Sequence, residues 1–393
     1  MKKKLVIFFV VIVCAMLVSA CGNLRNVALT VWCAEMDKDM ITGMTGDFLA
    51  ANKNVSSVNV EVCEDDKART TFGADPAAAA DVICIPHDQL GALVSENGIL
   101  EITGMKYIDA INGNTPPSVM AGQIDSKQYG FPSSFETHML FYDKSIITDE
   151  AAQTLEGILS SGIPGSGYRF AMDFDNAYFS ADWFFTYGCE LFGNNGEDAA
   201  SCDFDSDAGI AAMTYLIENR ESFANLTSDE AIELFKAHKL GAYIGGPWNA
   251  AAVTDALKGN YGCAKLPTVG GKDMKSFAGF KLYCVNANTG NQGPAMDLAA
   301  WLTNPENQKT RFQDRNLIPV SESLENDADV AASTTARAVM GQGPDSIAMP
   351  SIPQMDNFWT PTAAFTLACF NGEIAVQDLP AKLNELTSTI LNG

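Results

Sequence analysis

Short apolar runs alternate with more polar stretches along the first hundred residues. The runs at residues 28–33 (ALTVWC), 57–63 (SVNVEVC) and 81–85 (DVICI) have the length and the β-branched content of strands. The stretches between them predict helices over residues 36–52 and near 67–72. Alternating strands and helices predict a parallel sheet in an α/β domain. Ligands of such sheets bind beyond the carboxyl ends of the strands.

A later apolar run, residues 135–142 (FETHMLFY), contains a single carboxylate, Glu136. A lone Glu in a buried strand is costly unless it is paired or faces a wet cleft. The chain has 393 residues, more than the roughly 250–300 at which single cores stop growing. We therefore predict two domains, with this run as a strand that leaves one and enters the other, and with Glu136 at the crossing.

The alternation of strands and helices continues to the end of the chain. Strands are predicted at residues 168–172, 241–244, 262–267 and 281–285, and helices at 149–161, 177–187, 207–219, 229–239, 294–303, 305–315 and beyond 330. No internal repeat or low-complexity tract interrupts the pattern. The fold class predicted from the pattern is therefore α/β.

The N-terminus has the features of a targeting segment. Three lysines precede an apolar stretch at residues 5–18, which is shorter than the roughly 20 residues of a membrane-spanning helix. Residues 17–22 (LVSACG) resemble a bacterial lipobox. We expect residues 1–20 to be a lipoprotein signal peptide, Cys21 to be lipidated and 21–27 to be a tether. A secreted protein cut nearby and an uncleaved anchor are the alternatives.

Acidic residues outnumber basic ones, 48 against 25, and give a formal net charge of −23. Such a field repels nucleic acid and anionic lipid headgroups, so we expect no nucleic-acid partner. Hydrophobic residues make up 47% of the chain and charged residues 19%, which is typical of a globular protein with a large core.

Eight cysteines follow Cys21. An even number outside the cell permits disulfides, but several lie in apolar strand-like runs, where a buried free thiol is an equally good interpretation. Cys189 and Cys202 flank a Gly-Asn-Asn-Gly turn, and Cys33 and Cys63 end consecutive strands, so these are the candidate pairs. No cysteine or histidine spacing indicates zinc, and we predict no metal site.

Two tryptophans follow turns and are candidates for ligand contacts. Trp248 comes after Gly-Gly-Pro, and Trp359 comes after a proline-rich loop. Aromatic faces stack on the C–H face of a sugar, and nearby carboxylates accept protons from its hydroxyls. The alternative is that both tryptophans are core residues.

Motifs for catalysis and calcium binding are missing from the sequence. The acidic segment 203–209 lacks the residues that an EF-hand loop needs at its sixth and twelfth positions, so it predicts a hairpin strand followed by a helix start. GxSxG, HExxH and P-loop motifs are absent, and the three histidines have no evident nucleophile partner. We therefore predict that the protein is not an enzyme.

Six segments, in order, resemble the bacterial maltose/maltodextrin-binding proteins, the extracytoplasmic solute-binding components of ABC sugar importers. They are residues 84–102, 131–144, 176–179, 246–248, 260–267 and 352–359. The resemblance implies two α/β lobes with the ligand between them and crossings near 135–136, 263–265 and 316–317. The first lobe would hold residues 28–134 and 266–315, and the second 137–262 and 318–393.

The resemblance also implies a set of sugar contacts at Asp37, Lys38, Asp88, Glu136, Tyr178, Phe179, Trp248 and Trp359. Glu35 is an alternative in the first loop, which is one residue longer than in the family. Five residues depart from the family pattern. Ile85 replaces an aromatic residue, Gln89 an arginine, Asn176 a glutamate, Thr360 a tyrosine and Ala363 an arginine. Missing hydrogen-bond partners lower affinity strongly, so a longer α-glucan or a different oligosaccharide fits as well as maltose.

We therefore expect a monomeric, lipid-anchored receptor without cofactors on the extracytoplasmic face of the bacterial cell membrane. It would capture a maltodextrin-type oligosaccharide and deliver it to an ABC permease. A receptor of the same fold for another oligosaccharide, or for a polyamine, iron or an amino acid, is the first alternative. A surface glycosidase is the second, and it would need two carboxylates at a fixed separation.

Overall fold

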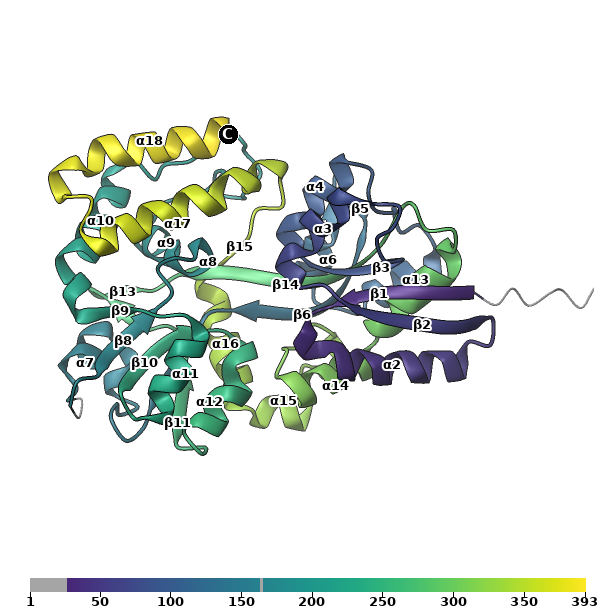
Figure 1. Ribbon diagram of the computed structural model, residues 1–393, viewed down its shortest axis with the longest axis horizontal. Helices are drawn as coiled ribbons and strands as arrows, with labels where there is room; N and C mark the ends of the chain where they lie inside the picture. The colour runs from purple at the N-terminus through teal and green to yellow at the C-terminus, as the bar shows by residue number, and fades with distance from the viewer. Residues whose placement is uncertain (1–26, 163–164) are drawn as a thin grey trace, which may run out of the picture.

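The computed structural model describes residues 27–162 and 165–393. Figure 1 shows two groups of helices and strands at opposite ends of an elongated molecule, with β6 and β14 extending between them. Each group is built on one large sheet. The fold is the expected two-lobed α/β arrangement, in which the first lobe begins with β1 and the second carries the C-terminus.

The sheet of the first lobe has the order β15-β14-β3-β1-β2, with β6 also paired to β14. β1 is parallel to β2 and β3, whereas β14 is antiparallel to β3 and β6. The parallel sheet expected from the sequence is therefore a mixed sheet. The strands are β1 Val27–Cys33, β2 Val55–Val62, β3 Val82–Pro86, β6 Gly130–Thr137, β14 Ser276–Val285 and β15 Ser346–Ala348.

Helices cover both faces of this sheet because successive side chains of a strand point to opposite faces. Val31 of β1 packs in a cluster with Phe48 and Leu298, while the adjacent Trp32 packs with Phe72 and Leu93. The helices of this lobe are α2 Lys38–Ala51, α3 Ala68–Ala74, α4 Leu90–Ser95, α5 Met105–Ile111, α6 Pro116–Ala121, α13 Gln292–Leu302 and α14 Pro305–Arg315.

The sheet of the second lobe has the order β11-β7-β10-β8-β9, with strands β7 Met139–Asp143, β8 Tyr168–Met172, β9 Phe223–Asn225, β10 Leu240–Gly245 and β11 Tyr261–Ala264. Stacked aromatic rings, among them Phe174, Trp183 and Phe223, fill one face. The helices are α7 Leu155–Ser160, α8 Ala177–Ser180, α9 Asp182–Tyr187, α10 Asp207–Asn219, α11 Ser228–Lys236, α12 Ala250–Ala256, α15 Ala328–Ala332, α16 Thr334–Gln342, α17 Asp356–Asn371 and α18 Leu379–Asn392.

The apolar run at residues 135–142 forms two strands, so the expectation of one continuous strand was wrong. β6 ends at Thr137 in the first sheet, and β7 begins at Met139 in the second, so His138 alone separates them. Glu136 is 6% exposed near the end of β6. The break has a physical reason, because β6 pairs with β14 and β7 pairs with β10 and β11.

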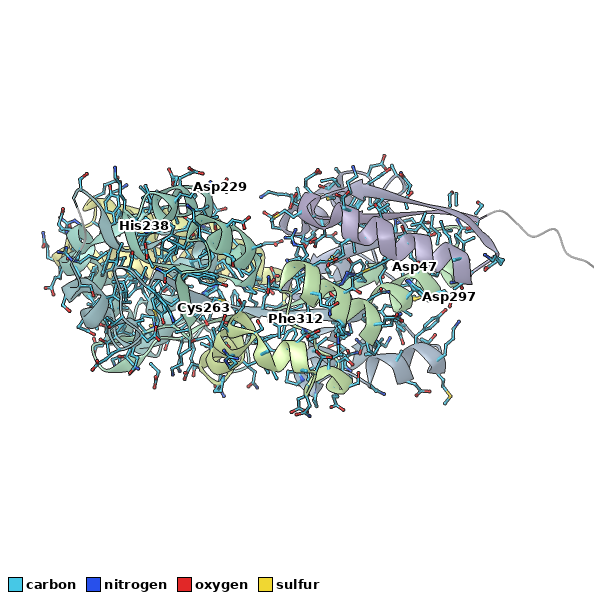
Figure 2. The ribbon with its side chains drawn as sticks, turned by 90° about the horizontal axis from the view of Figure 1, so that it is seen from below. Asp47, Asp229, His238, Cys263, Asp297 and Phe312 are labelled. Carbon is cyan, nitrogen blue, oxygen red and sulfur yellow. The ribbon has the colours of Figure 1, made fainter. Side chains whose placement is uncertain are left out.

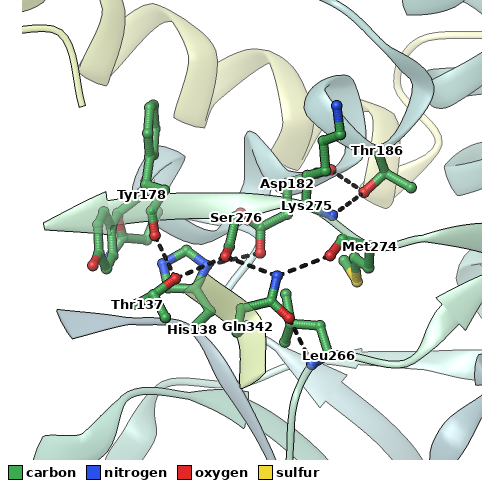
Figure 3. A network of polar contacts seen from close by, with 12 residues as sticks. Thr137, His138, Tyr178, Asp182, Thr186, Leu266, Met274, Lys275, Ser276 and Gln342 are labelled. Atoms are coloured by element: carbon green, nitrogen blue, oxygen red, sulfur yellow. Dashed lines mark hydrogen bonds and ion pairs between the residues drawn. The ribbon is translucent and has the colours of Figure 1, made fainter. Parts of the chain in front are cut away.

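Segments that pass between the lobes meet in a buried polar network (Figure 3). Thr137 Oγ1 and Ser276 Oγ share a hydrogen bond of 2.8 Å, and Gln342 Nε2 donates to the same Ser276 oxygen at 3.2 Å. Gln342 Oε1 accepts from the Leu266 amide at 3.0 Å. The fully buried Gln342 side chain thus links the end of β6, the start of β14 and the segment after β11.

The packing around residues 266 and 318 supports lobe boundaries later in the chain than expected. Leu266, Val269 and Phe277 belong to the hydrophobic cluster of the second lobe. Beyond α14, the Val320 carbonyl accepts a hydrogen bond of 2.8 Å from the Thr115 amide of the first lobe. We therefore propose that these two crossings lie later in the chain than the sequence suggested.

The eight cysteines of the described chain are free thiols, and six of them are buried. Burial raises the pKa of Cys189 and of Cys202 to about 12. Neither candidate disulfide is formed, and the buried-thiol interpretation is confirmed for Cys33, Cys63 and Cys189, whereas Cys202 is only partly buried.

The expectation for the acidic segment 203–209 is met in part: no hairpin strand forms there, but α10 begins within it. Ser206 caps α10 by accepting from the Gly209 amide, and the helix begins at Asp207. Acidic side chains lie on both lobes: Figure 2 shows Asp47 and Asp297 on the first lobe and Asp229 on the second.

The expected signal segment and Cys21 lie outside the described residues. Between Val27 and Gly393, leaving aside residues 163–164, no helix has both the length and the apolar content needed to cross a membrane.

Candidate functional site

Three aromatic rings of the second lobe form one side of the candidate site. Tyr178 and Phe179 lie on α8 after β8, and Trp248 lies in the 3-10 turn Pro247–Asn249 after β10. The Tyr178 ring centroid lies 6.3 Å from that of Trp248 and 5.3 Å from that of Phe179. Asn176 Oδ1 caps α8 by accepting from the Tyr178 amide at 3.0 Å. Asn176, one of the departures from the maltodextrin-binding pattern, therefore positions the tyrosine.

Gly246 makes room for the Trp248 ring. A Cβ at this position would lie 2.1–2.4 Å from three carbons of the indole, closer than carbon atoms approach in a folded protein. The Gly246 amide donates to Asn249 Oδ1 at 3.1 Å, which holds the turn. The Gly-Gly-Pro sequence thus allows the Trp248 ring to pack against the backbone of Gly246.

Phe277 connects these rings to Trp359. Its fully buried ring stacks on Tyr178, with centroids 6.2 Å apart and planes 10° apart, and lies 5.9 Å from the Trp359 ring on α17. Trp248 and Trp359 are only partly buried at the edge of the second-lobe core. Both residues therefore lie at the border of the core and are not enclosed within it.

Lys281 of β14 is the centre of a charged cluster. Its Nζ lies 3.1 Å from Asp65 Oδ2 and 3.7 Å from Glu136 Oε1. Burial raises the pKa of Glu136, and the Lys281 charge opposes the rise. Burial disfavours the lysine charge, but the two carboxylates outweigh it and raise the pKa of Lys281.

Asp88 lies beside this cluster on the turn His87–Gln89 after β3. Its Oδ1 is buried and has no hydrogen-bond partner among the described residues. Burial raises the pKa of Asp88 to about 7, against the opposing effect of Lys281. Burial also lowers the pKa of His87 to about 4, and its Nδ1 accepts from the Phe280 amide at 3.3 Å. A buried oxygen without a partner needs a donor, which a ligand hydroxyl would supply.

The aromatic and charged groups meet at the Tyr178 hydroxyl. This hydroxyl is buried and has no hydrogen-bond partner among the described residues. Burial raises the pKa of Tyr178, and so do the nearby carboxylates Glu136, Asp182 and Asp88. One location therefore combines ring faces, an unpaired hydroxyl and unpaired carboxylate oxygens.

Asp37 and Lys38 follow β1 in the turn that leads into α2. Asp37 Oδ1 lies 3.6 Å from Arg315 Nε, and burial raises the pKa of Asp37. The charges of Asp65 and Lys281 also act on Asp37, so it adjoins the charged cluster. The side chains of Lys38 and Glu35 are exposed.

A buried histidine and aspartate lie behind the aromatic rings (Figure 3). His138 Nδ1 lies 2.8 Å from Asp182 Oδ2, and both residues are fully buried. The His138 ring packs against Tyr178 at 4.4 Å and against Phe179 at 4.6 Å. Burial raises the pKa of Asp182 to about 6, with His138 opposing the rise. The pair therefore supports the rings from the side away from solvent.

Gln89, where the maltodextrin-binding pattern has an arginine, holds the loop after β2. Its Nε2 donates to the carbonyls of Asp65 and Asp66, and its Oε1 accepts from the Arg69 amide. Arg69 in turn pairs with Asp356, at the start of the helix that carries Trp359, and with Glu96 at 3.0 Å. The loop that Gln89 fixes therefore contributes both Asp65 and an ion pair between the lobes.

The described residues contain no group of three or more potential ligands that could hold a metal ion. Ring faces next to carboxylate oxygens suit an uncharged ligand with many hydroxyls.

The family model for bacterial extracellular solute-binding proteins matches residues 44–338. The chain belongs to this family. A galactooligosaccharide-binding protein of Bacillus subtilis (strain 168) is 31% identical over 389 residues, covering 92% of this chain and 91% of its own. A maltooligosaccharide ABC transporter solute-binding lipoprotein of Streptococcus pneumoniae (R6) is 28% identical and covers 75% of this chain and 72% of its own.

A solved structure of a solute-binding protein shares the whole architecture. The maltodextrin-binding protein MalE1 of L. casei BL23, determined without ligand, superposes with a TM-score of 0.82 at 27% identity. The match covers 94% of this chain and 100% of the other. The two-lobed fold is therefore that of a maltodextrin-binding protein.

The eight predicted contacts fall into three groups in this solute-binding protein. Tyr178, Phe179 and Trp248 lie together, Trp359 joins them through Phe277, and Glu136 and Asp88 lie in the cluster around Lys281. Asp37 adjoins that cluster, whereas Lys38 is exposed.

Four residues of the site were not among the predicted contacts: Asp65, Lys281, His138 and Arg69. A lone charge in an apolar run was the signal that identified Glu136, and the same signal marks Lys281 in residues 276–285 (SFAGFKLYCV).

Proposed function

We propose that the protein captures a neutral oligosaccharide outside the cell and delivers it to an ABC permease, with a maltodextrin as the first candidate ligand. Two lines of comparison support the proposal: a relative named as a maltooligosaccharide ABC transporter lipoprotein, and a similar fold in a maltodextrin-binding protein. The two lobes would close around the sugar by hinge motion, as is usual for binding proteins.

The observation that carries the proposal is the convergence of stacking rings and unpaired oxygens at Tyr178. Trp248, Trp359 and Tyr178 would stack on sugar rings, with Phe179 behind them. Asp88, Glu136 and Asp37 would accept protons from sugar hydroxyls. Each hydroxyl bond to a charged acceptor contributes more than a neutral one.

A galactooligosaccharide is the second candidate ligand. The Bacillus subtilis relative that is 31% identical carries this ligand in its name. The changed residues also weaken the case for maltose, because Gln89 and Asn176 are engaged in holding the protein's own loop and helix. Neither side chain therefore serves as the arginine or the glutamate of a maltose site.

We further propose that residues 1–20 are removed, that a lipid on Cys21 anchors a monomeric protein to the outer face of the cell membrane, and that the site has no catalytic turnover. A relative named as a lipoprotein supports the anchor.

Titration calorimetry of the soluble chain beginning after Cys21 tests the proposal. Maltose, maltotriose, longer maltodextrins and galactooligosaccharides would be titrated, and the mixtures would then be checked for hydrolysis products. We expect saturable binding of one of the two classes without products. Binding of neither class would overturn the proposal, and unchanged affinity in Trp248→Ala would overturn the site assignment.

A further inference from the structure

Lys281 lies inside a sheet, although a lysine is almost never buried without partners. It occupies β14, between β3 and β6, and its side chain is 20% exposed. Its partners are Asp65 at 3.1 Å, from the loop after β2, and Glu136 at 3.7 Å, from the end of β6. The strand, the crossing and the loop are thus joined by one ammonium group.

The carboxylates around Lys281 depend on its charge. Burial raises the pKa of Glu136 and of Asp88, and the charge of Lys281 is the largest opposing effect for both. Oδ1 of Asp65 and Oδ1 of Asp88 are buried without partners. Ionised oxygens held at fixed positions are the best acceptors for hydroxyl donors.

We propose that Lys281 is the positioning residue of the sugar site, and that it holds the side chains of Asp65 and Glu136 in place as acceptors for ligand hydroxyls. Asp65 is thereby added to the residues that contact the ligand. The inference rests on the proposed function, because it concerns the same oligosaccharide site.

The lysine next to Asp37 does not take this role. Lys38 is exposed at the start of α2, and none of the ion pairs formed within the described residues includes it. Lys281 instead meets carboxylates from two further elements. The cation that the resemblance placed in the first loop is therefore supplied here by β14.

The experiment compares Lys281→Met with the matched control Lys382→Met, at an exposed lysine of α18 that pairs with Glu385, by titrating the sugar that binds wild-type protein. Wild-type affinity is expected to rise with pH as the carboxylates ionise, so the titrations run between about pH 5.5 and pH 8.5. Other charged or titratable groups that act on the cluster include Asp37, Cys84, His87, Asp88, His138, Arg311 and Asp356.

Lys281→Met is expected to weaken binding roughly tenfold or more and to move the pH midpoint of binding upward, because the acids lose their nearest cation. Lys382→Met removes only an exposed ion pair and is expected to stay within about twofold of wild type. Lys281→Arg keeps the charge and is expected to keep the wild-type midpoint. If Lys281→Met does not fold, as judged by circular dichroism, Asp65→Asn takes its place and is expected to weaken binding.

Two results would overturn the inference: wild-type affinity in Lys281→Met or Asp65→Asn, and weaker binding in Lys281→Met with an unchanged pH midpoint. The second result would mean that Lys281 only supports the fold. Failure of wild-type protein to bind any sugar is a different result, which would refute the proposed function itself.

Discussion

The substitution Gly246→Ala displaces one ring of the site without removing it. The new Cβ would meet three indole carbons of Trp248 at 2.1–2.4 Å, against an ordinary contact distance of about 3.5 Å or more. Either the ring or the turn must therefore move by about 1 Å. The turn is held by Pro247 and by the hydrogen bond from the Gly246 amide to Asn249. We expect the ring to yield and to lose its place beside Tyr178.

The cost to sugar binding follows from the contact that is lost. Losing roughly 50–80 Å² of apolar contact at about 25 cal/mol per Å² costs roughly 1–2 kcal/mol, or a dissociation constant about 5- to 30-fold weaker. Calorimetry with the preferred sugar measures this change. Gly290→Ala is the matched control, because a Cβ there meets nothing within 4 Å, and we expect wild-type affinity.

Thermal unfolding of both variants separates a local effect from a loss of fold. Gly246→Ala is expected to weaken sugar binding clearly while lowering the melting temperature only slightly. If Gly246→Ala binds sugar as tightly as wild type while Trp248→Ala does not, the ring is not held where the structure places it, and the stacking argument is wrong.

Three further predictions concern Asp88, the ion pair between the lobes and Gln342. The pKa of Asp88 is raised from 3.8 to about 7 in the folded protein. Its contribution to stability is therefore fully present below the pKa of the unfolded chain and is lost as the pH rises through about 7. Asp88→Asn should remove this part of the pH dependence in thermal melts. Asp356→Asn breaks a partly exposed pair with Arg69, so sugar binding should weaken by no more than about fivefold and only at low salt, as calorimetry at two salt concentrations would show. An equal loss at high salt would contradict the ionic explanation. Gln342→Ala removes the bonds that Gln342 makes to the Leu266 amide and the Met274 carbonyl, and should lower the free energy of unfolding by about 1–3 kcal/mol in urea titrations. A wild-type midpoint would show that the network contributes nothing to stability.

Sequence reasoning succeeded where local signals agree with tertiary contacts. The bounds expected for α10 and α14 are those observed, because Ser206 and Asn304 cap them and their apolar faces meet the cores. Glu136 was found because a lone carboxylate in an apolar run demands a partner. Its partner, Lys281, was missed, since the predicted strand began at Lys281 and left out residues 276–280 of the same strand.

Long-range pairing was beyond the reach of the sequence. Residues 135–142 look like one strand, and only the pairing of β6 with β14 and of β7 with β10 shows the division at His138. Gln89 likewise appears as a lost arginine until its bonds to the loop after β2 are seen. In both cases the deciding partner lies far along the chain or in another loop, where periodicity carries no information.

The buried thiols have a practical consequence for following lobe movement. The thiolate is the reactive form of cysteine, and burial raises the pKa of native thiols such as Cys284 and Cys369. An alkylating dye will therefore react first with a cysteine introduced on the surface, even with the eight native ones in place. A single fluorescent label at the edge of either lobe can then report closure around a sugar in a chain that has lost none of its own cysteines.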